Sequence, residues 1–257
     1  MSLPIKLIST DFDGTLFAEF ENPPIPARFA ELIGDLQRRG AKWVINTGRE
    51  MSSLMESLAR AGLEVRPDFL VLVEREIYQH NGARYVPVEP WNTACREDHE
   101  QLFDRVRPEV AGLMDWVNER FDATVYADAW SPFCLIARNT QDADAVHNRL
   151  DGFCRQFPEL TVVRNDVYAR FSHVNYNKGT ALAELMRRLE VTNAEVLAAG
   201  DHLNDLPMLQ SKFSRHLVAP SNAIPAVKEL VEKQNGFVSR QPCGHGVVEG
   251  MENALRR

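Results

Sequence analysis

Cysteine is scarce in this sequence and is never clustered. The 257 residues contain four cysteines, and none lies within a few residues of another, so the sequence has no zinc or redox motif. We interpret them as free thiols of a protein in a reducing compartment. The remaining composition, 44% hydrophobic and 25% charged, is that of an ordinary globular chain and excludes a largely disordered one.

Long apolar runs and an excess of basic residues are also missing. No apolar stretch approaches the roughly 18 residues that span a bilayer, and residues 1–10 lack the charged and apolar regions of a signal peptide. Lysine and arginine total 29 against 36 acidic residues, giving a formal charge of −7, which argues against a dedicated nucleic-acid binder. We therefore expect a cytoplasmic protein with no nucleic acid, membrane or obligate protein partner. A small anionic substrate stays compatible, because a few local donors outweigh a mildly negative field.

Short apolar runs alternate with amphipathic segments in the first third of the chain. Predicted strands at 5–10, 43–45 and 69–73 are separated by predicted helices at 27–39 and 50–61. This order is typical of an α/β fold in which crossover helices connect the strands of a parallel sheet.

The same pattern returns after residue 178. Strands are predicted at 195–199 and 215–219, and helices at 180–189, 203–210, 223–232 and 247–255. We therefore assign residues 1–82 and 174–257 to one parallel-sheet core.

The intervening residues 83–173 show a different, α+β pattern. Asn81-Gly82 predicts a hairpin, and a long helix is expected at about 95–120, bent or split by Pro108. Two further strand pairs and one helix complete the insert. At roughly 90 residues it is too long for a loop, so we expect it to fold as a lid that closes over substrate.

Two aspartates follow the first predicted strand in the string Asp11-Phe12-Asp13-Gly14-Thr15. In open α/β sheets, ligands collect at the carboxyl ends of the strands. Gly14 permits a tight turn and Thr15 can fix it, so both carboxylates can face one site. One can then act as a nucleophile and the other as a proton donor. The alternative is a solvated, Asp-rich turn.

Three further motifs stand at strand ends or helix starts. Thr47-Gly48-Arg49 can form a phosphate pocket at a helix N-terminus, although Thr47 can equally be a plain helix cap. Lys178 begins a helix, where a cation opposes the helix dipole, so either a site needs its charge or it is a solvated surface residue. The string 200–205 (GDHLND) supplies carboxylates that suit Mg²⁺ when they gather opposite the first pair, or that simply cap a helix.

Taken together, the four motifs resemble the signature of the haloacid dehalogenase superfamily of phosphohydrolases: DxDGT, a Thr or Ser, a Lys, and GDxxND. The insert is similar to the type II caps, B subtype, of subfamily IIB, which includes Cof-like sugar phosphatases and sucrose-phosphate phosphatases. The resemblance covers the whole chain. It implies a Rossmann-like parallel-sheet core with an inserted α+β cap.

The resemblance also implies the catalytic and metal-binding roles. Asp11 attacks phosphorus and becomes an aspartyl-phosphate, and Asp13 protonates the leaving oxygen and later deprotonates water. Mg²⁺ is held by the Asp11 carboxylate, the Asp13 backbone carbonyl and Asp201, with Asp205 in or near its surroundings.

The remaining motif residues are expected to bind the phosphoryl oxygens. The resemblance implies that Thr47, the Gly48 N–H and Lys178 hold them, with Asn204 bonding to the phosphate or orienting its neighbours. The expected activity is therefore Mg²⁺-dependent removal of phosphate from a small phosphorylated metabolite, in particular a sugar phosphate.

Two other functions use the same residues: a phosphomutase that retains a bisphosphate, and a non-catalytic phosphate- or metal-binding module. Specificity residues are sought among the polar groups near the two junctions of the insert: Glu74, Arg75, Glu76 and His173. Tyr126 and Trp130 of the insert can stack on a sugar face or pack in its core.

Overall fold

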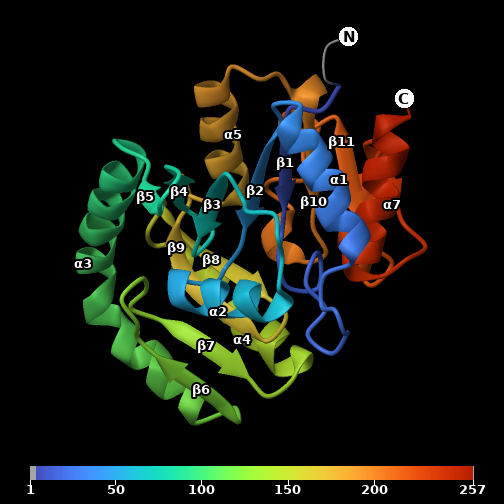
Figure 1. The fold of residues 1–257 in the computed structure, drawn as a ribbon. Helices are drawn as coiled ribbons and strands as arrows, with labels where there is room; N and C mark the ends of the chain where they lie inside the picture. Colours follow the sequence, from blue (N-terminus) through green and yellow to red (C-terminus); the bar gives the residue numbers. More distant parts are fainter. Residues whose placement is uncertain (1–3, 257) are drawn as a thin grey trace. The chain divides into compact units, whose positions relative to one another are not determined.

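The computed structural model describes residues 4–256, and the chain divides into two compact units (Figure 1). The first comprises residues 4–88 and 178–256, and the second residues 89–177. The sequence-based division lies at 82/83 and 173/174 instead. The hairpin that follows Glu76 explains the first difference, because both its strands pair within the sheet of the first unit. Residues 1–3 and 257 of the predicted core lie outside the described residues.

The described part of the first unit forms one eight-stranded sheet in the order β12-β11-β10-β1-β2-β3-β4-β5. Its strands are β1 (Leu7–Thr10), β2 (Lys42–Asn46), β3 (Phe69–Leu72), β4 (Glu76–His80), β5 (Tyr85–Pro87), β10 (Val196–Ala199), β11 (His216–Ala219) and β12 (Phe237–Val238). All neighbours from β12 to β3 are parallel, whereas β4 and β5 are antiparallel additions. The predicted parallel α/β sheet is confirmed.

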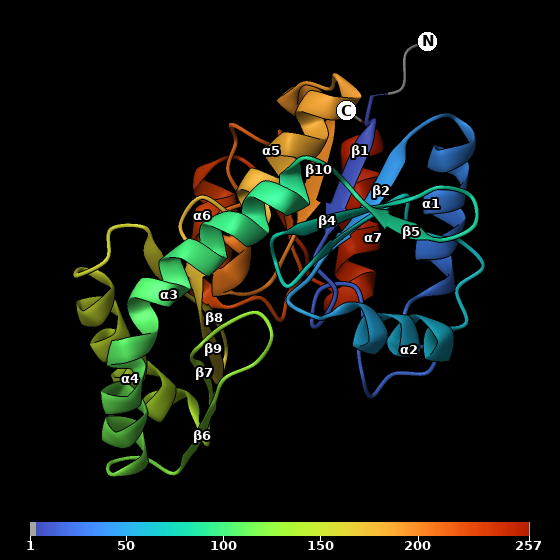
Figure 2. The ribbon, with the colours of Figure 1, turned by 90° about the vertical axis from the view of Figure 1, so that its left-hand side faces the viewer.

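Helices cover both faces of this sheet (Figure 2). They are α1 (Ala27–Arg38), α2 (Met51–Ala61), α5 (Lys178–Leu189), α6 (Pro225–Lys233) and α7 (Cys243–Leu255), with short 3₁₀ turns η1 (Asn193–Glu195) and η2 (Leu203–Asp205). On one face, Phe29 of α1 and Met251 of α7 pack with Ile8 and Trp43 of the sheet in a fully buried core. The alternating side chains of the strands thus hold a helix layer on each side.

The predicted helix at 203–210 is wrong, because only the 3₁₀ turn η2 (Leu203–Asp205) forms there. Two features explain this. Pro207 has no backbone N–H, so it cannot form the hydrogen bond to the Leu203 carbonyl that would continue the turn as an α-helix. In addition, the Asp205 carboxylate accepts the backbone N–H groups of Asp201 and His202, which fixes a tight turn directly after β10.

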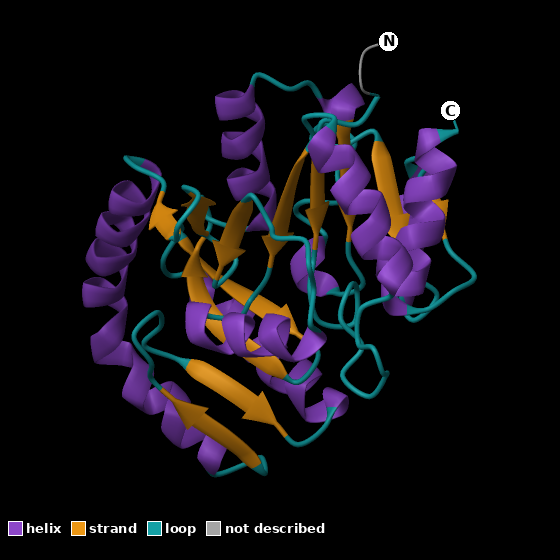
Figure 3. Cartoon of the chain, in the orientation of Figure 1, coloured by secondary structure: helices purple, strands orange, loops and turns teal. Residues whose placement is uncertain are grey.

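The second unit is an antiparallel sheet with two helices packed on one face (Figure 3). Its elements are α3 (Trp91–Asn118), β6 (Ala123–Tyr126), β7 (Cys134–Ala137), α4 (Thr140–Cys154), β8 (Leu160–Asn165) and β9 (Tyr168–His173), with strand order β6-β7-β9-β8. Pro108 lies inside α3 and does not split it. The buried residues Val106 and Val110 on either side belong to the unit's core, so packing outweighs the lost helical hydrogen bond.

The carboxyl ends of the parallel strands lie at one edge of the sheet in the first unit. Asp11 follows β1, Thr47 follows β2, Val73 follows β3 and Asp201 follows β10 by two residues. Because β3, β2, β1 and β10 are successive neighbours, this edge gathers the polar groups singled out in the sequence. No helix in the described range 4–256 combines the length and apolar character needed to cross a membrane.

Candidate active site

The loop after β1 is fixed against the end of β10. The Asp11 N–H donates to the Ala199 carbonyl (2.9 Å), which continues the strand pairing by one residue. The chain then turns at Gly14, whose φ is +72° and where a Cβ would lie 2.5 Å from Asp201 Oδ2. Thr15 Oγ1 donates to Asp201 Oδ1 (2.9 Å). The DxDGT string therefore needs its glycine for the close approach and its threonine to hold Asp201.

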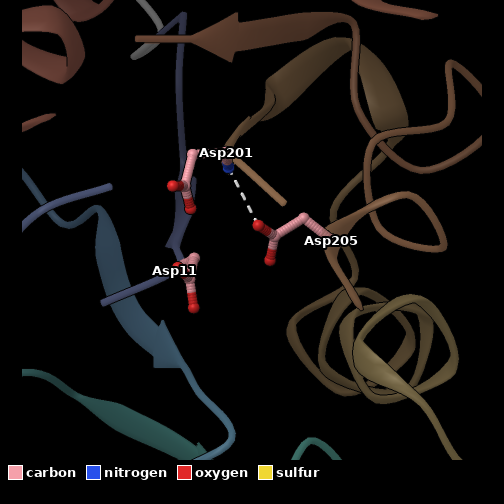
Figure 4. A group of neighbouring side chains, drawn as sticks. All are labelled: Asp11, Asp201 and Asp205. Atoms are coloured by element: carbon pink, nitrogen blue, oxygen red, sulfur yellow. Dashed lines mark hydrogen bonds between the residues drawn. The ribbon is translucent and has the colours of Figure 1, made fainter. Parts of the chain in front are cut away.

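Three aspartates converge at this edge. One carboxylate oxygen each of Asp11, Asp201 and Asp205 lies within 4.8 Å of the others. Figure 4 shows the three side chains gathered at this edge. Asp205 reaches the group because Gly200 has no side chain: a Cβ there would lie 2.5 Å from the Asp205 Cβ. The Asp205 Oδ2 atom accepts the N–H groups of Asp201 (2.9 Å) and His202 (3.0 Å).

Lys178, the first residue of α5, is fully buried beside these carboxylates. Its Nζ donates to Asp11 Oδ1 (2.6 Å) and to Asp205 Oδ1 (2.7 Å). Burial alone would lower the pKa of Lys178, but the surrounding carboxylates, led by Asp11, raise it above its ordinary value. Lys178 is therefore a buried ammonium ion, and the structure contradicts the alternative of a solvated surface lysine.

The carboxylates carry more negative charge than Lys178 compensates. Burial, followed by the charge of Asp205, raises the pKa of Asp11 well above its usual range. The same two causes raise the pKa of Asp201 to about 7. With all three carboxylates ionised, one ammonium would leave an excess of two negative charges in a buried place, which is costly without a compensating cation.

The donor set fits a divalent cation with oxygen ligands. Asp205 uses one oxygen for Lys178 and the other for two backbone N–H groups, so Asp11 and Asp201 are the carboxylates open to such an ion. Hard cations such as Mg²⁺ and Ca²⁺ take carboxylate and carbonyl oxygens in this way.

Asp13 forms a separate ion pair with Arg49, which lies two residues before the start of α2. Arg49 Nε donates to Asp13 Oδ2 (2.8 Å) and Arg49 Nη2 to Asp13 Oδ1 (2.6 Å). The hydroxyls of Ser53 and Ser57 on α2 accept from Arg49 Nη1 at 3.1 and 2.7 Å. The hydrogen bonds to Asp13, followed by its negative charge, raise the pKa of Arg49. The Asp13 carboxylate is therefore oriented from α2 and lies outside the three-aspartate cluster.

The three remaining predicted phosphate-binding residues meet at Glu74. The Glu74 N–H donates to the Thr47 carbonyl (2.9 Å), and Asn204 Nδ2 donates to Glu74 Oε1 (2.8 Å). A Cβ at Gly48 would lie 3.3 Å from the same Glu74 oxygen. Glu74 is buried and has a φ of +66°, an uncommon conformation for a residue other than glycine. The structure thus brings Thr47, Gly48 and Asn204 together around Glu74, with Gly48 and Asn204 next to its carboxylate.

Three residues that take part in these contacts were not assigned a role from the sequence: Glu74, Arg49 and Asn222. Glu74 stood only among the candidates near the insert, and Arg49 had no assigned role. Asn222 was not considered: its Nδ2 donates to the Gly14 carbonyl (2.8 Å) and lies 3.4 Å from Asp201 Oδ2. Asn222 and Glu74 follow β11 and β3, so applying the strand-end rule to every strand would have found both.

Comparison with known proteins identifies the family of the chain. The family model of the haloacid dehalogenase-like hydrolases matches residues 112–250, more than half of the chain, and the model described as sucrose-6F-phosphate phosphohydrolase matches residues 4–118. The chain belongs to the haloacid dehalogenase-like hydrolase family. The predicted resemblance to subfamily IIB is confirmed, and with it the prediction that the chain is an enzyme of this phosphatase family.

Individual relatives are distant but cover nearly the whole chain. The 5-amino-6-(5-phospho-D-ribitylamino)uracil phosphatase YcsE of Bacillus subtilis is 27% identical over 241 residues, covering 89% of this chain and 88% of the relative. The sucrose-phosphatase of Synechocystis, solved with sucrose and phosphate, has a TM-score of 0.71 at 17% identity and covers 98% of both chains. SMU.1108c of Streptococcus mutans has a TM-score of 0.69 at 18% identity, covering 98% of this chain and 100% of that one. These structures establish the fold.

Proposed function

We propose that this protein is a Mg²⁺-dependent phosphatase that removes phosphate from a small phosphorylated metabolite through an aspartyl-phosphate on Asp11. The observation that carries the proposal is the buried Lys178, hydrogen-bonded to Asp11 at 2.6 Å beside Asp201 and Asp205. A nucleophilic carboxylate and an anionic phosphate repel each other, so a site for their reaction must concentrate positive charge where they meet. Lys178 supplies one such charge.

The chain's own groups account for both steps. In the first, an Asp11 oxygen attacks phosphorus and the bond from phosphorus to the substrate oxygen breaks, while Asp13 supplies the proton that the leaving oxygen takes up. In the second, Asp13 accepts a proton from the water that attacks phosphorus, so phosphate leaves and Asp11 is restored.

Mg²⁺ fits the donor set described above. Asp11, Asp201 and the Asp13 carbonyl would hold it, with Asp205 orienting the surroundings through Lys178 and the backbone. When bound, the ion supplies positive charge that lets the Asp11 carboxylate and a phosphate approach each other. Thr47, the Gly48 N–H, Lys178 and Asn204 then hold the phosphoryl oxygens.

Sugar phosphates are the proposed substrate class. The support comes from the match of residues 4–118 to the sucrose-6F-phosphate phosphohydrolase model, and from the fold shared with a sucrose-phosphatase. YcsE, whose named substrate carries a phosphorylated ribityl chain, points to the same broad class of phosphorylated polyols and sugars.

The test is phosphate release from a panel of phosphorylated sugars, nucleotides and cofactors, with Mg²⁺ and with EDTA. We expect release that needs Mg²⁺ and is lost in Asp11→Asn, while Asp35→Asn, a surface carboxylate on α1, keeps full activity. Acid quenching during turnover should trap one phosphoryl group on wild-type protein and none on Asp11→Asn. A fully active Asp11→Asn variant overturns the assignment of the nucleophile. If phosphate transfer requires a sugar bisphosphate and no inorganic phosphate is released, the protein is a phosphomutase and the proposed phosphatase function is wrong.

A further inference from the structure

A groove of about 630 Å³ opens in the first unit, between α2, residues 63–67 and the β4–β5 hairpin. Its walls include the side chains of Met51, Met55, Leu58, Leu63, Val65 and Tyr85. These residues are partly buried and pack against the hydrophobic core, which holds the lining side chains in place. The volume lies within the range of about 300–1,000 Å³ that is typical of small-molecule sites. Two of the lining residues, Met51 and Met55, are methionines, whose flexible side chains adapt to varied apolar ligands.

The polar groups of the groove are predominantly cationic. Arg66 and Arg84 line it, and Glu64 is the one carboxylate among its lining residues. Neither arginine forms an ion pair with any residue in the described range 4–256, whereas twelve other arginines in that range do. The charge of the groove is therefore complementary to an anion.

The contacts of His80 point to the same conclusion. The Gly82 N–H donates to His80 Nδ1 (3.1 Å), so Nδ1 is the acceptor and the proton of the neutral ring is on Nε2. The Nε2 atom lies 3.1 Å from Arg66 Nη1, which can only donate. Two donors thus face each other with no acceptor between them. A carboxylate oxygen placed beside them would accept from both.

We propose that this groove binds an organic anion with an apolar body, specifically a medium-chain carboxylate. The methionine and leucine side chains of α2 contact the chain, and Arg66, Arg84 and His80 bind the carboxylate. The groove shares no lining residue with the candidate active site, so the proposal stands independently of the proposed phosphatase activity.

Isothermal titration of the full-length protein with decanoate tests the proposal. We expect one saturable site. Decanamide has the same chain without the charge and should bind at least tenfold more weakly, because charge-assisted hydrogen bonds to arginine are lost. The double variant Arg66→Gln/Arg84→Gln should bind decanoate at least tenfold more weakly than wild type.

Controls separate a specific site from general attraction. Arg107→Gln changes an exposed arginine of α3 and should leave the decanoate affinity unchanged. Arg66 and Arg84 are exposed, so the double variant should keep the wild-type melting temperature. A failure to saturate at millimolar decanoate overturns the proposal. So does equal binding of decanoate and decanamide, or equal affinity of the double variant and wild type.

Discussion

Lys178 offers the sharpest test of how the site is held together. Replacing it with methionine keeps an unbranched side chain of similar length but removes the ammonium group that Asp11 and Asp205 share at 2.6 and 2.7 Å. Both carboxylates are buried, so they would remain in the interior without a cation. Breaking a buried pair by removing one partner costs about 3–5 kcal/mol. We expect the free energy of unfolding of Lys178→Met to fall by that amount in metal-free buffer.

Urea denaturation with linear extrapolation measures this change. Lys233→Met, an exposed lysine at the end of α6, is the matched control and should shift the unfolding free energy by no more than about 0.5 kcal/mol. The double variant Lys178→Met/Asp11→Asn removes one stranded carboxylate along with the lysine. It should therefore be more stable than the sum of the single changes predicts, by at least about 1 kcal/mol. A loss below about 1 kcal/mol in Lys178→Met would refute the reasoning.

Three further results are expected. Asp11→Asn should abolish phosphate release while its circular dichroism stays that of wild type, and residual turnover would contradict the assigned role. Gly200→Ala places a Cβ 2.5 Å from the Asp205 Cβ and should cost about 1–3 kcal/mol in thermal unfolding, whereas Gly112→Ala in the open interior of α3 should be neutral or stabilising. Burial raises the pKa of Cys134 to about 11 from an ordinary 9.0, so its thiolate fraction at pH 8, and its alkylation rate by iodoacetamide, should be about 100-fold below that of a free thiol. Rapid labelling of its peptide in mass spectrometry would rule this out.

The strand-end positions of the candidate site residues were easier to predict from the sequence than the partners of these residues. Apolar runs that end at Asp11, Thr47 and Gly200 were readable because buried parallel strands must be apolar and their polar groups must follow. The hairpin at Asn81-Gly82 was readable because that pair favours a tight turn. Such signals are local, and local signals survive in a single sequence.

Contacts made across the fold could not be predicted in this way. The pairing of Arg49 with Asp13 depends on how α2 enters from β2, and the position of Glu74 depends on a positive φ at the end of β3. The unbroken course of α3 through Pro108 depends on packing on both sides of the proline. In each case a tertiary contact outweighs the local preference of the residue.

Helix α2 contributes side chains to two separate places in the first unit. Ser53 and Ser57 on one face fix Arg49, and through it the orientation of Asp13, while Met51 and Met55 on another face form a wall of the groove. A ligand that shifted this helix would therefore change both surfaces at once. Thermodynamic reciprocity then requires that whatever factor groove binding exerts on phosphate affinity, phosphate exerts on groove binding. Helix α2 thus connects the support of Asp13 to the groove proposed for an organic anion.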